Sequence, residues 1–229
     1  MTPEDFAKAR RTLMRRDPVL APVIKHHRTR SLLDAPAVDP FSALVRTITS
    51  QQISTKAAAT IHGRLVGLMP GGVATPDGIL SLADEQFRAA GLSRQKIAYL
   101  RDLGAKVTSG ELPIASLHEL DDEDVIQAIV KVKGLGRWSA EMFLMFRLRR
   151  PDVLPVDDLG IVNAIQRLYG LRKRPKADRI RKIGDAWRPY RTIACWYLWR
   201  SLETRMELPK PKIEPGKRVT KKPGTGRTR

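Results

Sequence analysis

The sequence predicts an all-α fold, with one helical domain over about residues 1–207. Two observations lead to this prediction: apolar residues recur at the spacing of a helix face along most of the chain, and residues that cap helices stand at the ends of these segments. A third is that no alternating pattern typical of a strand hairpin is found. Apolar residues make up 42% of the 229 residues, so the chain can bury the core of one large domain or of two small ones.

The first predicted helices lie between residues 39 and 68. In "DPFSALVRTI", Asp39 is expected to cap a helix whose first residue is Pro40, because these residue types favour these positions. Apolar residues three and four apart form its buried face: Phe41, Leu44, Val45 and Ile48. A second helix carries Ile61, Leu65 and Leu68 and stops at "MPGG".

More helices are predicted along the rest of the chain. "TPDGILSL" and "ADEQFRAAG" indicate short ones, and "LSRQKIAYLRDLGAKVTSG" a longer one with Ile97, Leu100 and Val107 inside. "DDEDVIQAIVKVKG" has acidic residues in its first turn and Gly134 after its end, an arrangement that favours a helix. Further helices are expected at 137–149, at about 157–169, in "KADRIRKIGDAW" and in "YRTIACWYLWRSLETR".

The charge of the chain favours a polyanionic partner. Lys and Arg number 42 against 24 Asp and Glu, a net charge of +18, and nucleic acid is the first candidate for such a surface. A membrane surface is a weaker candidate, because no basic helix with a clean apolar face and no lipidation signal is found. A basic protein without any such partner is the third. The tail, residues 208–229, is expected to be disordered: its last 20 residues hold eight Lys and Arg against one acid, as in a solvated tail or a non-specific DNA arm.

Cysteine and histidine usage argues against a metal centre. Cys195 is the only cysteine, which rules out an internal disulfide and any four-cysteine zinc or iron–sulfur site. Its apolar neighbours indicate a buried, inert thiol. The four histidines have no metal-ligand spacing: His26, His27, His62 and His118. No signal peptide and no apolar run of 18 residues is found, so a soluble, cytoplasmic protein without a metal site is expected.

The stretch "IVKVKGLGRWSAEMFLMF" predicts two helices joined by a tight hairpin, whose residues are Lys133, Gly134, Leu135, Gly136 and Arg137. Glycine permits positive φ and the close approach of another chain. The N–H groups that open a helix suit a phosphate oxygen, and Lys131, Lys133 and Arg137 add positive charge. The hairpin is therefore a candidate DNA contact, and an ordinary corner with glycine caps is the alternative.

A pair of aspartates, Asp157 and Asp158, precedes the helix in "LPVDDLGIVNAIQRLYG". Adjacent carboxylates repel each other, so the pair requires a reason. Capping of the helix is one. A functional carboxylate is the other, and a helix N-terminus favours its ionised form.

Taken together, these segments resemble the helix–hairpin–helix (HhH-GPD) base-excision DNA glycosylases, and among them the alkylpurine, or 3-methyladenine, DNA glycosylase II group. The resemblance lies in "FSALVRTITSQQISTKAA", "GLGRWSAEMF", "DVLPVDDLGI" and "WRPYRTIACWYLWR", in this order. It covers roughly residues 38–205. It implies two helical lobes with the active site in the cleft between them, and it assigns the catalytic carboxylate to Asp158, with Asp157 as the fallback.

The resemblance also assigns a substrate pocket. Trp138 and Trp199 match pocket positions, where aromatic faces attract a positively charged alkylated purine. The alternative for each is a core tryptophan. Trp199 shares its helix with Trp196 and Tyr197, and one or two of these three are expected to fill core. Met142 stands where some relatives have a tyrosine, and a flexible methionine would soften that wall of the pocket.

A flipped base leaves a hole in the duplex that a wedge residue must fill. Gln52 in "TSQQIST" matches the wedge position of the family. Ile53 is the neighbouring candidate, and a polar helix break is the alternative for the whole segment.

Bifunctional relatives carry a nucleophilic lysine just after the hairpin, where this chain has Trp138. The resemblance therefore implies a monofunctional glycosylase that binds double-stranded DNA with alkylated bases, uses water as nucleophile, acts as a monomer and needs neither a cofactor nor an iron–sulfur cluster. It allows a monovalent cation held by the hairpin carbonyls. Two alternatives stay open: a non-catalytic DNA-binding protein, in which a carboxylate near phosphates would cost affinity, and a bifunctional oxidised-base glycosylase, which would need the missing lysine.

Overall fold

The computed structural model describes residues 1–34 and 38–203. All regular structure in these ranges is helical and none is strand, which confirms the predicted all-α fold. No helix in the same ranges combines the length and the hydropathy needed to span a bilayer. The predicted basic tail, residues 208–229, lies outside the described residues.

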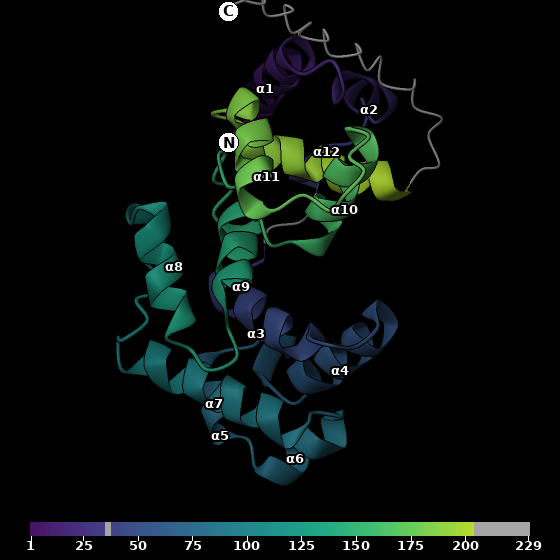
Figure 1. Cartoon of the computed structure of the whole chain (residues 1–229). Coiled ribbons are helices and arrows are strands. Elements are labelled where there is room, and N and C mark those ends of the chain that lie inside the picture. Colours follow the sequence, from purple (N-terminus) through teal and green to yellow (C-terminus); the bar gives the residue numbers. More distant parts are fainter. Residues whose placement is uncertain (35–37, 204–229) are drawn as a thin grey trace, which may run out of the picture.

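Five consecutive helices form one lobe, at the bottom of Figure 1. They are α3 (Pro40–Ser50), α4 (Thr55–Gly67), α5 (Pro76–Ser81), α6 (Asp84–Ala90) and α7 (Arg94–Thr108). Helix α7 packs against α5 and α3, and α4 packs against α3 and α6. The predicted start of α3 is confirmed, because Asp39 accepts the N–H of Ser42 and Pro40 is the first helical residue.

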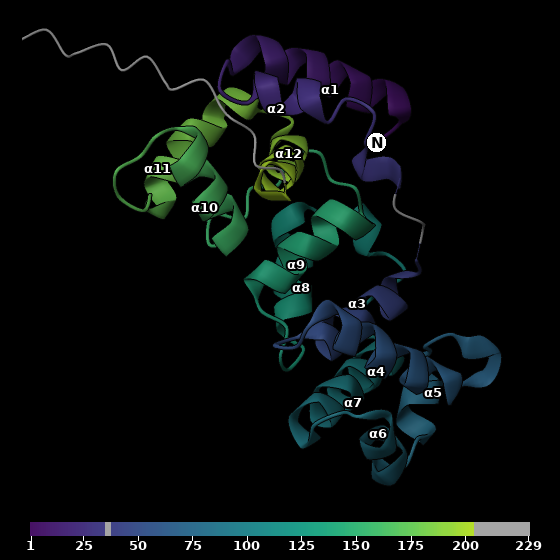
Figure 2. The same cartoon turned by 90° about the vertical axis from the view of Figure 1, so that its right-hand side faces the viewer.

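The other lobe is built from both ends of the chain (Figures 1 and 2). It contains α1 (Pro3–Arg16), α2 (Ala21–His26), α10 (Leu159–Leu168), α11 (Ala177–Gly184) and α12 (Arg191–Glu203). Helix α12 packs against α10, α1 and α2. Helices α1 and α2 have no counterpart among the individually predicted helices, although they lie within the predicted all-α region.

Asp17 fixes the turn between α1 and α2 to the second half of the chain. Its carboxylate accepts the N–H groups of Val19 and Leu20, in the turn just before α2, at 2.9 and 3.0 Å. It also accepts hydrogen bonds from Trp187 Nε1, at 2.6 Å, and from the Tyr169 hydroxyl. A buried carboxylate needs such partners, and Asp17 is only 5% exposed. The first two helices are thus anchored to the α10–α12 part of their lobe.

Helix α8 (Asp122–Val130), the glycine hairpin and α9 (Arg137–Met142) lie between the lobes (Figure 1). Helix α9 continues into a π-helical segment, Phe143–Arg147, and such segments occur frequently at functional sites. The buried apolar residues of both lobes belong to one continuous core. Close packing therefore sets the two lobes in a defined relation, with the hairpin and α9 at their junction.

Candidate active site

Asp158 stands at the start of α10 and is the centre of the candidate site. Its Oδ1 accepts the N–H of Ile161 at 2.8 Å, as an N-cap side chain does. Its own N–H donates to Pro155 O at 3.1 Å, which closes the preceding turn. Only 8% of the residue is exposed. Capping and burial together hold this carboxylate in one place, whereas the neighbouring Asp157 is exposed.

Two tryptophan indoles hold the same carboxylate. Trp199 on α12 donates from Nε1 to Oδ1 of Asp158 at 2.9 Å, and Trp138 on α9 donates from Nε1 to Oδ2 at 2.8 Å. Three helices therefore meet at one side chain. The structure brings the predicted aspartate and both predicted pocket tryptophans together. Trp196 and Tyr197 are buried and fill core, in line with the expectation that one or two aromatic residues of this helix would.

Gly160 permits the close approach of Trp199 to the carboxylate. A Cβ at this position would lie 2.8 Å from Trp199 Cδ1 and 3.0 Å from Asp158 Oδ1. Any side chain there would push the indole or the carboxylate away. Gly160, two residues after Asp158, is therefore needed for the indole of Trp199 to reach the carboxylate.

Among the described residues, the hydrogen bonds to this carboxylate leave one acceptor position unused. Each carboxylate oxygen can accept about two hydrogen bonds. Among the described residues, Oδ1 has two donors, Ile161 and Trp199, whereas Oδ2 has only Trp138. Oδ2 can therefore accept one further hydrogen bond from a water molecule, or face a positive charge that develops nearby.

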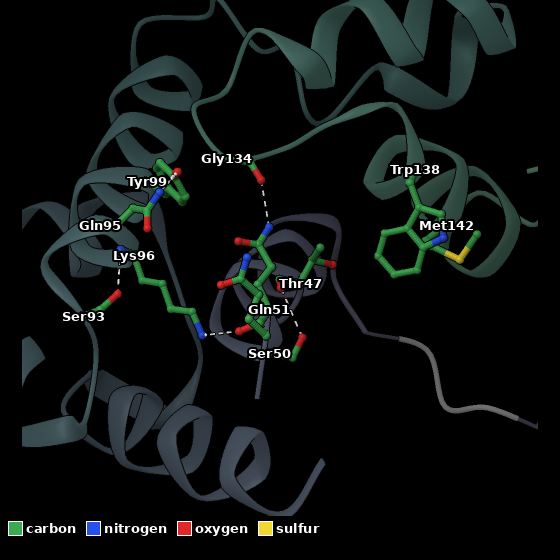
Figure 3. Close-up of a pocket in the computed structure, with 11 residues that line it drawn as sticks. Thr47, Ser50, Gln51, Ser93, Gln95, Lys96, Tyr99, Gly134, Trp138 and Met142 are labelled. Carbon is green, nitrogen blue, oxygen red and sulfur yellow. Dashed lines mark hydrogen bonds between the residues drawn. The ribbon is translucent and has the colours of Figure 1, made fainter. Parts of the chain in front are cut away.

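A cavity of about 570 Å³ adjoins this cluster, between α3, α7, the hairpin and α9 (Figure 3). Trp138 and Met142 lie together on one side of it, and Gln52 also lines it. Trp138 is 47% exposed, so it forms a wall of the cavity and not core. Asp158 itself is not a lining residue and is connected to the cavity through the Trp138 indole. The other walls are mostly polar: Thr47, Ser50, Gln51, Ser93, Gln95, Lys96, Tyr99 and Gly134.

A second hollow, of about 360 Å³, shares Met142, Thr47 and Ser50 with the first. Phe146 lines it and stacks on Trp199, with ring centroids 5.8 Å apart and an interplanar angle of 29°. Phe146 is 43% exposed and is not among the predicted site residues. Met142, Thr47 and Ser50 thus line both hollows, and each hollow has an aromatic wall, Trp138 in the first and Phe146 in the second.

Gln52, the predicted wedge, has a φ of 57°. This left-handed conformation is uncommon for a residue other than glycine. Gln52 lies in the loop between α3 and α4 and faces the cavity, whereas the alternative candidate, Ile53, does not line it. Of the two candidates, Gln52 is the one placed at the cavity.

The two glycines of the hairpin, Gly134 and Gly136, are explained by different structural constraints. Gly134 has a φ of +81°, and a Cβ there would overlap the ring of Tyr99 on α7, so only glycine fits. Gly136 precedes α9 with a φ of −99°, and a Cβ there would have no atom within 4 Å. The protein's own packing does not require glycine at 136. The close approach of another chain, such as a DNA backbone, would require it. Leu135, between them, is 3% exposed and belongs to the core.

The two basic residues of the hairpin differ in how free their charges are. Lys133 has an exposed side chain whose Nζ lies 4.0 Å from Asp102. Arg137 donates two hydrogen bonds to Glu123, at 3.0 and 2.9 Å, and pairs with Glu141 at 3.3 Å. A guanidinium already held by two carboxylates is less suited to a phosphate than the sequence indicates. Lys133 is the better placed of the two predicted contacts.

Glu141 is a further ionisable group that the sequence pattern does not single out. It lies one turn after Arg137 on α9 and is 8% exposed. Burial raises its pKa to about 6; Arg137 opposes this shift, and Asp157 and Asp158 add to it. An Arg–Glu pair four residues apart is the only signal in the sequence, and it does not reveal burial.

The structure leaves the cofactor predictions open. Gly134 O, one of the hairpin carbonyls, accepts a hydrogen bond from Gln51 Nε2 at 2.7 Å. Within residues 1–34 and 38–203 no group of three or more His, Cys, Asp or Glu is arranged to hold a metal ion. Cys195 is fully buried, as predicted, and burial raises the pKa of its thiol. A cation at the hairpin, and the lack of any cofactor, stay predictions.

Comparison with known proteins identifies relatives that are DNA repair glycosylases. Residues 45–189 match the family model described as HhH-GPD superfamily base excision DNA repair protein. DNA-3-methyladenine glycosylase 1 of Schizosaccharomyces pombe is 38% identical over 165 residues, which cover 71% of this chain and 72% of the relative. DNA-3-methyladenine glycosylase of Saccharomyces cerevisiae is 31% identical over 245 residues, covering 89% of this chain and 82% of the relative.

Solved structures have the same fold. The 3-methyladenine DNA glycosylase of S. pombe, in complex with abasic DNA, superposes with a TM-score of 0.76 at 33% identity and covers 86% of this chain and 98% of its own. A DNA-3-methyladenine glycosidase from Bacillus halodurans superposes with a TM-score of 0.74 at 36% identity, covering 89% of this chain and 90% of its own.

Proposed function

Because this chain belongs to the HhH-GPD superfamily of base excision DNA repair proteins, we propose that it is a DNA glycosylase that removes alkylated purines from double-stranded DNA. One observation carries the proposal. The carboxylate of Asp158 is held by two indole N–H groups and a backbone N–H, and Oδ2 keeps the capacity to accept one more hydrogen bond. An N-cap alone does not call for two indole donors.

The reaction begins when the damaged nucleotide leaves the base stack. An alkylated purine such as 3-methyladenine or 7-methylguanine carries positive charge and is attracted to aromatic faces. Trp138 and Phe146 offer such faces in the two hollows that Met142 lines, and Trp199 stacks on Phe146. These residues are therefore proposed to bind the flipped base beside Asp158.

Asp158 acts on the sugar. The positive charge makes the base a good leaving group, so no strong general acid is needed. As the N-glycosidic bond breaks, the sugar becomes cationic, and a fixed carboxylate lowers the free energy of that state. Oδ2 can also orient the attacking water molecule and accept its proton. Hydrolysis then yields the free base and an abasic site.

A monofunctional reaction is proposed, without a lyase step. The position just after the hairpin holds Trp138, which cannot form a covalent link to the sugar. Lys133 lies on the outer part of the hairpin with an exposed side chain, where it is better suited to a phosphate. We further propose that the protein acts as a cytoplasmic monomer without a cofactor; gel filtration with light scattering would test the oligomeric state.

Release of free base from a methylated duplex, identified by chromatography, tests the proposed function. The wild-type protein should release methylated purines and leave abasic sites that break only after hot alkali. Asp158→Asn should lower single-turnover release by at least about 100-fold, whereas Asp157→Asn, on the exposed neighbour, should retain most activity. If Asp158→Asn is as active as wild type, the catalytic assignment is wrong. If the wild-type protein releases no base, the proposed enzyme function is wrong.

Covalent trapping tests the monofunctional part separately. Borohydride added during the reaction should trap no adduct between protein and DNA, because no amine attacks the sugar. A trapped adduct would identify a lysine nucleophile and restore the bifunctional alternative.

A further inference from the structure

One face of α7 contacts both elements that are proposed to meet the DNA. Lys96, Tyr99 and Asp102 are spaced three residues apart, so they lie on the same side of the helix. Lys96 contacts the segment that leads into Gln52, and Tyr99 and Asp102 contact the hairpin. Residues 51–54, which connect α3 to α4 and include Gln52, form the wedge loop.

Lys96 holds the start of the wedge loop through the backbone. Its Nζ donates to Gln51 O (Figure 3) and to Thr49 O, both at 2.8 Å. These carbonyls stand at the end of α3, where the last C=O groups lack helical partners and carry partial negative charge. Within the described residues Lys96 has no carboxylate partner. In this part of the chain its half-buried ammonium group therefore donates its hydrogen bonds to backbone carbonyls and not to a side chain.

Gln52, the residue after Gln51, has an unfavourable backbone conformation that must be stabilised by its surroundings. Gln52 has a φ of 57°, a left-handed conformation that is unfavourable for a residue with a side chain. Such a conformation persists only where its surroundings enforce it. Lys96 fixes the carbonyl of the peptide bond that leads into Gln52, so it acts directly on the strained position.

The same segment is joined to the hairpin. Gln51 Nε2 donates to Gly134 O at 2.7 Å. The ring of Tyr99 lies directly against Gly134, and Asp102 Oδ2 accepts the N–H of Lys133 at 2.8 Å. The α7 face thus fixes the wedge loop and the hairpin relative to each other.

We propose that Lys96 is a positioning residue for base flipping: it holds Gln52 in the conformation, and at the distance from the hairpin, that opening the duplex requires. The proposal rests on the proposed glycosylase function. Without Lys96 the wedge loop would relax, and less of the DNA would reach the flipped state, while Asp158 and its indole partners would be unchanged. Loss of Lys96 should therefore slow excision of a paired base, which is difficult to flip, and not excision of an unpaired base, which is easy to flip.

Excision from paired and unpaired lesions separates these cases, because an unpaired base costs less to extrude. Lys96→Met removes the ammonium but keeps most of the apolar stem. It should lower the single-turnover rate at saturating protein by about tenfold or more for a methylated purine in a paired duplex, and by no more than about threefold for the same base in a single-base bulge. Lys96→Arg, which restores the donors, should recover most of the paired rate. Lys106→Met, on the same helix but paired with Glu111, should change neither rate.

Two outcomes of this assay would overturn the proposal. Equal losses on both substrates would place the effect of Lys96 in the chemical step or in folding. A uniform loss of affinity for all DNA, with a salt slope lower by about 1, would make Lys96 a phosphate contact.

Hydrogen exchange of the free protein tests the same role without any activity. Amides of the wedge loop should exchange at least about tenfold faster in Lys96→Met than in wild type, while amides of α10 and α12 keep their rates. Unchanged exchange in the wedge loop would show that Lys96 does not hold it. If the wild-type protein released no base, the proposed function would fail, and this measurement would still decide whether Lys96 holds the loop.

Discussion

The hydrogen bond between Trp138 and Asp158 can be measured as a coupling free energy. In Asp158→Asn the side chain has one oxygen and one NH₂ group. The oxygen should occupy the Oδ1 position, because two donors, Ile161 N and Trp199 Nε1, point at it. The NH₂ group then faces Trp138 Nε1, and two donors meet where the distance is 2.8 Å in the wild type.

The expected magnitude follows from this geometry. A hydrogen bond to a charged acceptor contributes about 1.5–3 kcal/mol. Asp158→Asn removes this bond, Trp138→Phe removes the same bond, and the double variant removes it only once. The two single decreases in the free energy of unfolding should therefore sum to more than the decrease in the double variant by at least about 1.5 kcal/mol. The lost bond contributes the lower end of the range, because Trp138 is 47% exposed and water can replace its N–H. The contact between two donors in Asp158→Asn adds to this value, because Trp138→Phe removes that contact in the double variant.

Urea unfolding followed by far-ultraviolet circular dichroism is the suitable assay, since tryptophan fluorescence changes with the substitution itself. A second cycle that combines Trp138→Phe with Asp157→Asn is the matched control. The Trp138 indole donates to Asp158 and not to Asp157, so that cycle should be additive within about 0.5 kcal/mol. If the Asp158 cycle is equally additive, the indole does not hold the carboxylate, and the proposed arrangement of the site is wrong.

Three more predictions concern the hairpin, α9 and the tail. Gly134→Ala should lower the free energy of unfolding by at least about 1–2 kcal/mol, whereas Gly136→Ala should leave it unchanged and weaken duplex binding; equal urea midpoints, or unchanged affinity for Gly136→Ala, would contradict this. The pKa of Glu141 is raised from 4.5 to about 6, so the folded protein binds this proton more tightly and the free energy of unfolding should fall, by up to about 2 kcal/mol, as pH rises through that window. Urea titrations of Glu141→Gln should lack this slope, and a slope equal to that of wild type would refute it. Deleting residues 208–229 should reduce the slope of log K against log salt by about 0.9 for each phosphate that the tail neutralises and spare single-turnover excision; an unchanged slope would mean that the tail neutralises none.

The helices were predictable where a side chain marks their ends. Asp39 and Asp158 both cap helices that the apolar spacing already indicates. Helix α1 is harder, although Thr2 and Asp5 form a capping box. It buries only three residues, in a strongly basic segment, and it packs against α12, near the other end of the chain, as well as against α2. No local pattern contains that information.

The residue types of the site were predictable, but their partners were not. Trp138 and Trp199 are singled out for their aromatic faces, while the structure shows that their N–H groups also hold Asp158. Arg137 is expected at DNA, yet Glu123 from the preceding helix holds it. Such pairs depend on how two helices pack after the hairpin, and the sequence specifies that only through the whole fold.

The lobe that carries Asp158 joins residues from the two ends of the chain, and this has a consequence for synthesis. Asp17 must find Trp187, 170 residues later, and α12, which supplies Trp199, ends at Glu203. The other lobe, α3 to α7, is continuous in sequence and can pack as soon as it leaves the ribosome, because domains fold as units from the N-terminus. Helices α1 and α2 must wait for α12 with their apolar faces uncovered. A truncated nascent chain would therefore have a nearly complete α3–α7 lobe and no assembled carboxylate site. The proposed active site around Asp158 can form only after α12 has been synthesised.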